Sequence, residues 1–174
     1  MGSVIAILFL VFVSILFVIS VYWTTRKGAP WEPSTMDMAH TMLKLAQVGP
    51  EDLVYDLGSG DGRIPVIAAL KYGASAVGIE IDPLRCLISR LAARFLGVKD
   101  RVEFRRADFF QEDLRDATVV TCYLLQDTND DLYEKFRAEL APGTRVVSNT
   151  HTFHLISPVE AKGDAQLFIF NPLE

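Results

Sequence analysis

Cysteine is scarce in this sequence, and its scarcity excludes two kinds of stabilising framework. The only cysteines are Cys86 and Cys122, each inside an apolar run, with no CxxC pair and no Cys/His cluster. Such a chain has neither a disulfide framework nor the cysteine ligands of a structural metal. We therefore predict two reduced core cysteines and no metal site.

An excess of basic residues is also missing. The 174 residues include 17 lysines and arginines against 22 aspartates and glutamates, which gives a formal net charge of −5. Domains that bind nucleic acid generally carry the opposite balance, because they must neutralise phosphates. The composition therefore argues against a nucleic acid partner, and the length is that of one domain.

Charge is absent altogether from residues 4–23, which read VIAILFLVFVSILFVISVYW. A helix of this length crosses a hydrocarbon core of roughly 30 Å. The segment has no polar side that could face water, so a surface helix of a soluble domain is a poor match. We therefore predict a transmembrane helix through residues 4–23.

The residues beside this run set its orientation. Tyr22 and Trp23 end it with rings suited to the headgroup region, and Arg26 and Lys27 follow, whereas no lysine or arginine precedes it. The positive-inside bias therefore predicts a single-pass membrane protein whose C-terminal domain is cytoplasmic. A cleaved signal peptide would need a basic leading segment and a shorter apolar stretch. The predicted division is an anchor over residues 1–27 and a domain over residues 28–174.

After the anchor, helical and strand patterns alternate. Ser34 and Asp37 have capping-box spacing before a helix over residues 36–48. The later helices are predicted over residues 64–73, from the Asp82-Pro83 cap onward, and from a cap at Asp127 or Thr128. The strands are predicted over residues 53–58, 75–82, 101–108, 117–125 and 144–150, with a final hairpin over 158–170. This order predicts an α/β, Rossmann-like, doubly wound seven-stranded sheet, mostly parallel with an antiparallel edge strand.

The helix that begins after Asp82 has a marked periodicity. Its large apolar side chains fall on one face: Leu84, Leu87, Ile88, Leu91 and Phe95. Its basic side chains lie off that face: Arg85, Arg90 and Arg94.

A glycine-rich turn follows the first predicted strand, over residues 56–63 (DLGSGDGR). It is not a dinucleotide fingerprint, because Arg63 stands in the place of the third glycine of GxGxxG. Asp56 and Asp61 would also repel a pyrophosphate. Two carboxylates favour a cationic ligand instead, and S-adenosylmethionine carries a sulfonium and an ammonium. We predict that this cofactor is bound by Asp56, Gly58, Ser59, Gly60, Asp61 and Gly62.

Three further strand ends complete the predicted cofactor site. Glu80, followed by Ile81, ends the second strand, where a carboxylate can accept hydrogen bonds from both ribose hydroxyls. Asp108 and Phe109 end the third strand, where a carboxylate can bind the adenine amino group and an apolar ring can pack on the base. Tyr123 ends the fourth strand, beside the point where the strand order reverses. The carboxyl ends of parallel strands share one edge, so these residues are expected to lie together.

These residues resemble the class I (Rossmann-like) methyltransferases. The segments VYDLGSGDGR, GIEIDP and LAPGTRVVS, together with residues 123–140, are most similar to one family of protein-lysine methyltransferases. That family includes archaeal enzymes and the mitochondrial enzymes that methylate the ATP synthase c-subunit and the adenine nucleotide translocase. The resemblance extends from about Pro30 to the C-terminus. It implies S-adenosylmethionine as cofactor, S-adenosylhomocysteine as product, and a protein substrate that could itself be a membrane protein.

The acceptor sets a second demand on the site. A lysine ammonium has no lone pair, and presenting the neutral amine at pH 7 costs roughly 4–5 kcal/mol because its unperturbed pKa is about 10.4. We predict that Tyr123 and Trp31 are the catalytic residues, forming an aromatic acceptor channel. Trp31 could equally be an interfacial aromatic of the anchor. His151 or His154 could act as a base, since histidine titrates near neutral pH.

Two other functions stay open at this point. A membrane-anchored enzyme of this kind could methylate a lipid, a quinone or another small molecule. A non-catalytic membrane scaffold could also retain the fold, although the intact glycine turn and Glu80 argue against it. An oligomer held together by the single helix is open as well.

Overall fold

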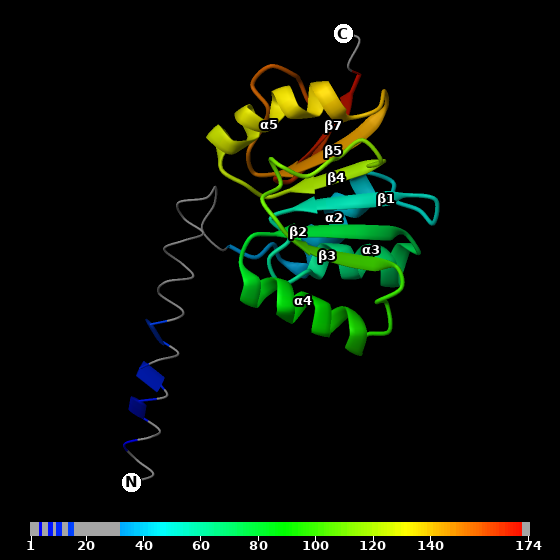
Figure 1. Ribbon diagram of the computed structural model, residues 1–174. Helices are drawn as coiled ribbons and strands as arrows, with labels where there is room; N and C mark the ends of the chain where they lie inside the picture. Colours follow the sequence, from blue (N-terminus) through cyan, green and yellow to red (C-terminus); the bar gives the residue numbers. More distant parts are fainter. Residues whose placement is uncertain (1–3, 5–6, 9, 12–13, 16–31, 172–174) are drawn as a thin grey trace. The chain divides into compact units, whose positions relative to one another are not determined.

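The computed structural model describes residues 4, 7–8, 10–11, 14–15 and 32–171 (Figure 1). The chain divides into two compact units, Met1–Glu32 and Pro33–Glu174. The described residues between positions 4 and 15 are helical, and the Ser14 hydroxyl donates to the Leu10 carbonyl at 2.9 Å. No helix among the described residues is long and apolar enough to cross a membrane. Most of the predicted span over 4–23 lies outside the described residues.

The second unit has the predicted alternation of helices and strands. Its helices are α2 (Met36–Leu45), α3 (Arg63–Tyr72), α4 (Pro83–Phe95) and α5 (Gln126–Glu139). Its strands are β1 (Leu53–Leu57), β2 (Ser75–Glu80), β3 (Val102–Arg106), β4 (Val119–Cys122), β5 (Thr144–Asn149), β6 (Glu160–Lys162) and β7 (Ala165–Phe170). They form one seven-stranded sheet in the order β3-β2-β1-β4-β5-β7-β6. The Rossmann-like sheet and its number of strands are therefore confirmed.

The position of the antiparallel strand differs from the prediction. β7 pairs antiparallel with β5 on one side and with β6 on the other, so it lies second from the edge. The edge strand is β6, which has only three residues. A short, exposed edge strand offers little backbone for pairing with another chain. The final hairpin folds back so that its longer, more buried strand, β7, pairs with β5.

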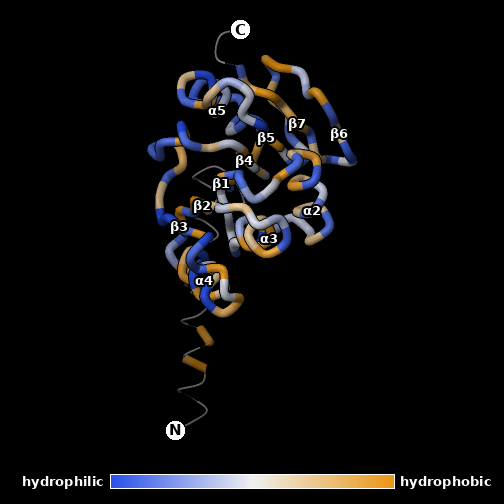
Figure 2. Tube along the Cα trace, turned by 90° about the vertical axis from the view of Figure 1, so that its right-hand side faces the viewer, coloured by the Kyte–Doolittle hydropathy of each residue, from blue (hydrophilic) through white to orange (hydrophobic). Residues whose placement is uncertain are grey.

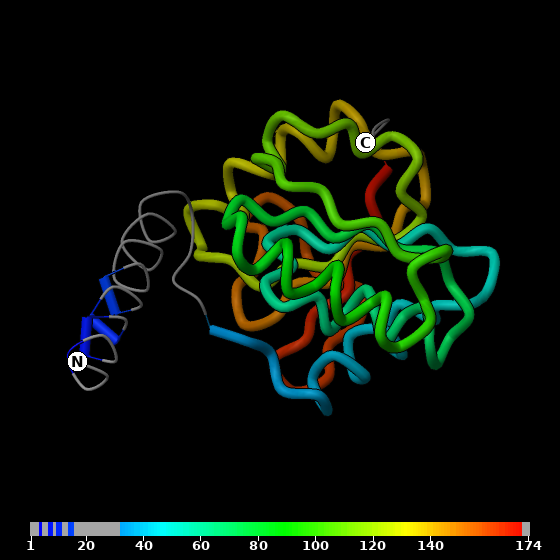
Figure 3. The backbone as a smooth tube through the Cα atoms, turned by 60° about the horizontal axis from the view of Figure 1, so that its bottom comes forward, coloured from blue at the N-terminus to red at the C-terminus, as the bar shows by residue number. Residues whose placement is uncertain are grey.

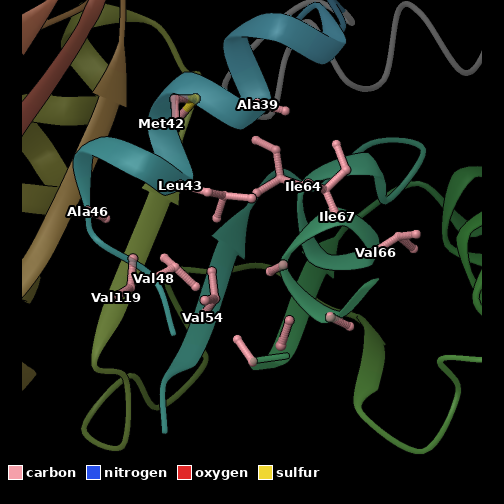
Figure 4. Packing of buried hydrophobic residues seen from close by; sticks show 14 of the residues in the cluster. Ala39, Met42, Leu43, Ala46, Val48, Val54, Ile64, Val66, Ile67 and Val119 are labelled. Atoms are coloured by element: carbon pink, nitrogen blue, oxygen red, sulfur yellow. The ribbon is translucent and has the colours of Figure 1, made fainter. Parts of the chain in front are cut away.

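The reversal of strand order between β1 and β4 places the helices on two faces, because crossovers between parallel strands are right-handed. On one face, α2 and α3 pack on the sheet through an aliphatic core that includes Met42, Leu43 and Ile67 (Figure 4). On the other face, α5 packs through an aromatic cluster in which Phe136 contacts Phe153 and Phe170. Both cysteines are buried, as predicted.

Two helix caps were predicted wrongly. The N-cap of α2 is Thr35, whose hydroxyl accepts from Met38 N at 3.1 Å, and not Ser34. The N-cap of α5 is Leu125, earlier in the chain than Asp127 or Thr128, and it makes no side-chain cap hydrogen bond. The cap of α4 is the predicted Asp82, which accepts from two backbone N–H groups.

The apolar face of α4 does not meet the core. The buried side of α4 consists of the small residues Cys86, Ser89 and Ala93. The predicted apolar stripe is exposed instead, with Leu91 at 57% and Phe95 at 89% exposure. A helix with one apolar stripe usually buries it in its own domain, so this face needs a separate explanation.

Candidate functional site

The site lies at the carboxyl ends of β1 and β4, where the strand order reverses. Ligands of open α/β sheets bind in the crevice at such a switch point. Asp56 of β1 is paired in register with Thr121 of β4, and the Thr121 hydroxyl donates to Asp56 Oδ1 at 2.7 Å. Both side chains are buried. The structure thus buries the first predicted carboxylate between the carboxyl ends of β1 and β4, with a hydroxyl partner that sequence reasoning missed.

The backbone donors of the glycine turn are occupied within the protein. Gly58 N and Ser59 N both donate to the Ile79 carbonyl, at 2.9 and 3.0 Å, and Gly62 N donates to the Ser59 carbonyl at 2.8 Å. Gly60 N donates to Glu80 Oε2 at 2.8 Å. A phosphate-binding loop would instead point these N–H groups at its ligand. The geometry therefore supports the exclusion of a dinucleotide pyrophosphate.

Glu80 joins the glycine turn to the start of α4. Its Oε2 accepts from Gly60 N and its Oε1 accepts from Asp82 N, each at 2.8 Å. The side chain is buried, and burial raises its pKa, while the hydrogen bonds from Asp82 and Gly60 oppose that rise. Each carboxylate oxygen keeps a second lone pair, so two ligand hydroxyls can still be accepted.

Asp61 has a partner inside the protein. Arg63 forms an ion pair with the Asp61 carboxylate and also donates to the Ser34 carbonyl oxygen. Burial raises the pKa of Asp61, but the hydrogen bonds and charge of Arg63 outweigh it and leave that pKa lowered. Asp61 is therefore ionised, and Arg63 neutralises its charge. Because Arg63 also bonds to Ser34, it links the glycine turn to the segment before α2.

Asp56 is the carboxylate that no basic side chain neutralises within the described residues. Burial raises the pKa of Asp56 to about 7; the Thr121 hydrogen bond opposes the rise, and the negative charges of Asp61 and Glu80 add to it. A buried carboxylate in this state would be relieved by a positively charged ligand. The residues present therefore fit the sulfonium and ammonium of S-adenosylmethionine.

Two glycines hold the turn against the sheet. A Cβ at Gly62 would lie 2.4 Å from the Phe104 ring, and a Cβ at Gly78 of β2 would lie 2.6 Å from the same ring and 2.8 Å from Ser59 Oγ. Ser59 Oγ is buried and lacks a hydrogen-bond partner within the described part of the chain. The side chains of Phe104 and of Ser59 in the turn can thus pack against β2 only because position 78 has no side chain. Gly78 is a residue of the site that the sequence analysis missed.

Gly78→Ala is therefore expected to destabilise the domain by about 1–3 kcal/mol, the usual cost of overpacking a filled core. It should also weaken cofactor binding, because the displaced group is the turn itself. Gly49→Ala is the matched control, since a Cβ there meets nothing within 4 Å. Chemical denaturation and calorimetric cofactor titration measure both effects. Equal behaviour of the two variants would contradict the assigned role.

The remaining predicted site residues have mixed surroundings. Asp108 follows β3 and folds back on its own turn, where its Oδ1 accepts from Phe110 N at 3.1 Å. Phe109 is half-buried, and its ring centroid lies 4.9 Å from that of Phe110. Ile81 and Tyr123 are half-buried directly after β2 and β4. Trp31 lies outside the described residues. The assignment of all these residues to the cofactor or acceptor stays a prediction.

The two candidate bases differ in their partners. His154 Nδ1 lies 2.8 Å from Asp130 Oδ2 of α5, although the histidine is exposed. His151 is half-buried, and its carbonyl accepts from Asn129 Nδ2 at 3.1 Å. Asn129 is fully buried and ties α5 to the end of β5 through Ser148. The sequence showed no acidic partner for either histidine, and the structure supplies one to His154 alone.

Fold and site together define a Rossmann-like methyltransferase that uses S-adenosylmethionine. Residues 56–160 match the ANTKMT methyltransferase domain, and the chain belongs to that family. It is 41% identical over 127 residues to a protein-lysine N-methyltransferase of Saccharolobus islandicus, covering 72% of this chain and 78% of that protein. It is 34% identical over 140 residues to the adenine nucleotide translocase lysine N-methyltransferase of Mus musculus. That match covers 80% of this chain but only 60% of the mouse protein.

A solved structure resembles most of this chain. The crystal structure of an RNA methyltransferase from Salinibacter ruber in complex with S-adenosyl-L-homocysteine is 43% identical, with a TM-score of 0.76. The match covers 79% of this chain and 93% of that chain.

Proposed function

We propose that the chain is a membrane-anchored protein-lysine N-methyltransferase. The observation that carries this proposal is the 41% identity to a protein-lysine N-methyltransferase over most of that protein's length. The relatives named for the adenine nucleotide translocase and for the ATP synthase c-subunit point to the same acceptor group. The catalytic domain lies in the cytoplasm, as the basic residues Arg26 and Lys27 after the apolar run indicate.

The reaction places few chemical demands on the protein. S-adenosylmethionine supplies an electrophilic methyl group, so the side chains must bind, orient and exclude water rather than attack. Asp56 and Glu80 hold the cationic cofactor and its ribose. Tyr123, which directly follows β4, contributes an aromatic ring to the channel that admits the acceptor.

The acceptor amine must arrive without its proton. Desolvation and the nearby positive charge lower the pKa of a lysine that enters the channel. His154, whose Nδ1 lies 2.8 Å from Asp130 Oδ2, is the candidate acceptor of the released proton. The second histidine, His151, has its backbone carbonyl engaged by Asn129.

Transfer of tritium from labelled cofactor tests the acceptor class. Membranes incubated with the chain should show labelled protein bands, and prior acetylation of lysines should remove them. Glu80→Ala serves as the inactive control. Label that partitions into organic solvent would instead assign a lipid or quinone acceptor.

A nucleic acid acceptor is the rival that the structural comparison raises, because the Salinibacter relative is named an RNA methyltransferase. The net charge of −5 argues against it here. The same tritium assay decides the matter when total RNA is added. Ribonuclease-sensitive label, unaffected by blocked lysines, would replace the proposed acceptor.

Removing residues 1–27 tests the anchor separately. High-salt and carbonate washes should release the shortened chain from the membrane fraction, and it should still bind S-adenosylmethionine, because the sheet and its core lie within Pro33–Glu174. Retention of the shortened chain after high-salt and carbonate washes would contradict the anchor. Loss of cofactor binding would show that the first unit is needed for the fold.

A further inference from the structure

The outer face of α4 is an apolar stripe that no described segment covers. We call this stripe, with the leucine that follows the helix, the α4 face. Its members and their exposures are Leu84 (57%), Leu87 (51%), Ile88 (48%), Leu91 (57%), Phe95 (89%) and Leu96 (45%). Figure 2 shows apolar positions, in orange, along this helix. Figure 3, which brings the bottom of Figure 1 forward, shows α4 (green) at the front of the domain.

The residues of the α4 face are spaced so that they lie along one side of the helix. Its residues recur at three and four positions, so they lie in one row opposite the buried Cys86, Ser89 and Ala93. Single exposed leucines are ordinary on a protein surface, but a continuous row is not. The row does not belong to the core of the domain, because the opposite side of α4, with its small buried residues, already packs on the sheet.

α4 is basic in a chain whose net charge is negative. Its sequence PLRCLISRLAARF contains three arginines and no acidic residue, in a chain with a net charge of −5. The sequence of α5, QDTNDDLYEKFRAE, has five acidic and two basic residues, and α5 lies at the opposite end of the sheet (Figure 1). Arg90 is held in place by donating to the Phe104 carbonyl from Nε at 3.0 Å and Nη2 at 2.7 Å.

The arginines frame the apolar row. At 100° per residue, Arg85 falls on one side of the row, and Arg90 and Arg94 fall on the other. Their long side chains can reach headgroups while the leucines enter the boundary with the acyl chains. An apolar row of aliphatic side chains with basic flanks is the pattern of a helix that lies in a membrane interface.

We propose that α4 docks on an anionic membrane surface, with the α4 face in the interface and the basic flanks of the helix toward the phosphate headgroups. This contact does not depend on the identity of the methyl acceptor. The chain length agrees with it: nine residues separate Trp23 from the second unit at Pro33, a reach of roughly 30 Å at most. Because α4 begins three residues after Glu80, the docked helix holds the carboxyl edge of the sheet close to the membrane.

The first test uses the chain without residues 1–27, so that the anchor cannot contribute. It should sediment with vesicles of equal parts phosphatidylcholine and phosphatidylglycerol, and not with phosphatidylcholine alone, and salt should weaken the binding. Leu87→Ser with Leu91→Ser should reduce the affinity about tenfold or more. Leu155→Ser, at a leucine that is 71% exposed elsewhere, should leave it unchanged.

The outcomes separate the alternatives. Absence of binding to the mixed vesicles, or equal binding to both kinds, overturns the proposal. So does equal loss in the Leu155 control. Retained calorimetric cofactor binding shows that the double variant is folded, and this readout does not involve the methyl acceptor.

The second test uses the full chain with an environment-sensitive dye at Leu91→Cys. Native thiols should not compete, because burial raises the pKa of Cys86, and that of Cys122 to about 12. The dye should shift to the blue only when anionic vesicles are present, and dye at Leu155→Cys should not. A dye already shifted before vesicles are added overturns the proposal: concentration dependence would identify a second copy as the occupant, and independence would identify the chain's own first unit.

Discussion

Asp56→Asn should stabilise the folded domain above neutral pH while it weakens cofactor binding. The pKa of Asp56 is raised to about 7, mainly by burial, from the usual aspartate value of 3.8. A raised pKa means that the favourable contribution of Asp56 is fully present below about pH 4 and is lost as the pH rises through 7. The asparagine stays neutral, so it avoids this loss, and its amide oxygen can still accept from Thr121.

The expected stability gain is a few kcal/mol at pH 8 and close to zero at pH 4, since a tenfold change in an acid dissociation constant corresponds to about 1.4 kcal/mol. Denaturation of both proteins by urea at the two pH values measures it. Thr121→Val provides the comparison: it removes the hydroxyl but leaves the carboxylate, and it should destabilise the domain at pH 8. A gain that is the same at both pH values would mean that ionisation of Asp56 is not its cause.

Cofactor affinity should show the opposite trend. If the cation is bound by the ionised carboxylate, protonation competes with binding, and affinity rises about tenfold from pH 6 to pH 8 for a group with a pKa of about 7. Asp56→Asn should bind weakly at both pH values and with no pH dependence. Calorimetric titration across this range measures both proteins. If the affinity of the native chain did not change with pH, the Asp56 carboxylate would not interact with the cofactor.

The predicted strand ends were found because the sheet is parallel. The carboxyl ends of β1, β2 and β4 share one edge, so a strand pattern alone places Asp56, Glu80 and Tyr123 near each other. The partners of these residues could not be predicted in the same way. Thr121 lies 65 positions from Asp56, and the pairing between the two depends on β4 lying next to β1. Long-range register leaves no periodic trace in the sequence.

Periodicity predicted the existence of α4 but not its orientation. A regular apolar row has the same spacing whether it meets a core, a membrane or a partner. Here the small residues Cys86, Ser89 and Ala93 allow α4 to approach the sheet closely, and the large residues are left outside.

The local sequence rules for helix capping also failed at the start of α2. Ser34 has the spacing of a capping residue, yet its carbonyl is engaged by Arg63 and its hydroxyl lies 3.5 Å from Asn149 Nδ2. Thr35 caps α2 in its place. A tertiary contact with the glycine turn thus overrides the local preference. The same contact explains how Asp61 is neutralised.

Glu80→Ala should have the largest effect on cofactor binding of any single change. The native carboxylate accepts from Gly60 N and Asp82 N at 2.8 Å and retains lone pairs for two ribose hydroxyls. Hydrogen bonds to a charged group contribute about 1.5–3 kcal/mol each, so losing two ligand bonds lowers affinity on the order of 10²–10⁴-fold. The two buried N–H groups would also lose their acceptor, which loosens the turn.

Glu80→Gln separates these two effects. The glutamine keeps one acceptor oxygen, but its amide must face either Gly60 N or Asp82 N, a donor against a donor. Like the alanine variant, it should bind the cofactor much more weakly than the native chain. It should nevertheless unfold at a temperature closer to that of the native chain. Glu103→Gln, at an exposed glutamate of the neighbouring β3, is the control and should bind normally. Native affinity in Glu80→Gln would mean that neither the charge nor the second oxygen of Glu80 contacts the cofactor, and the site assigned to the ends of β1 and β2 would be wrong.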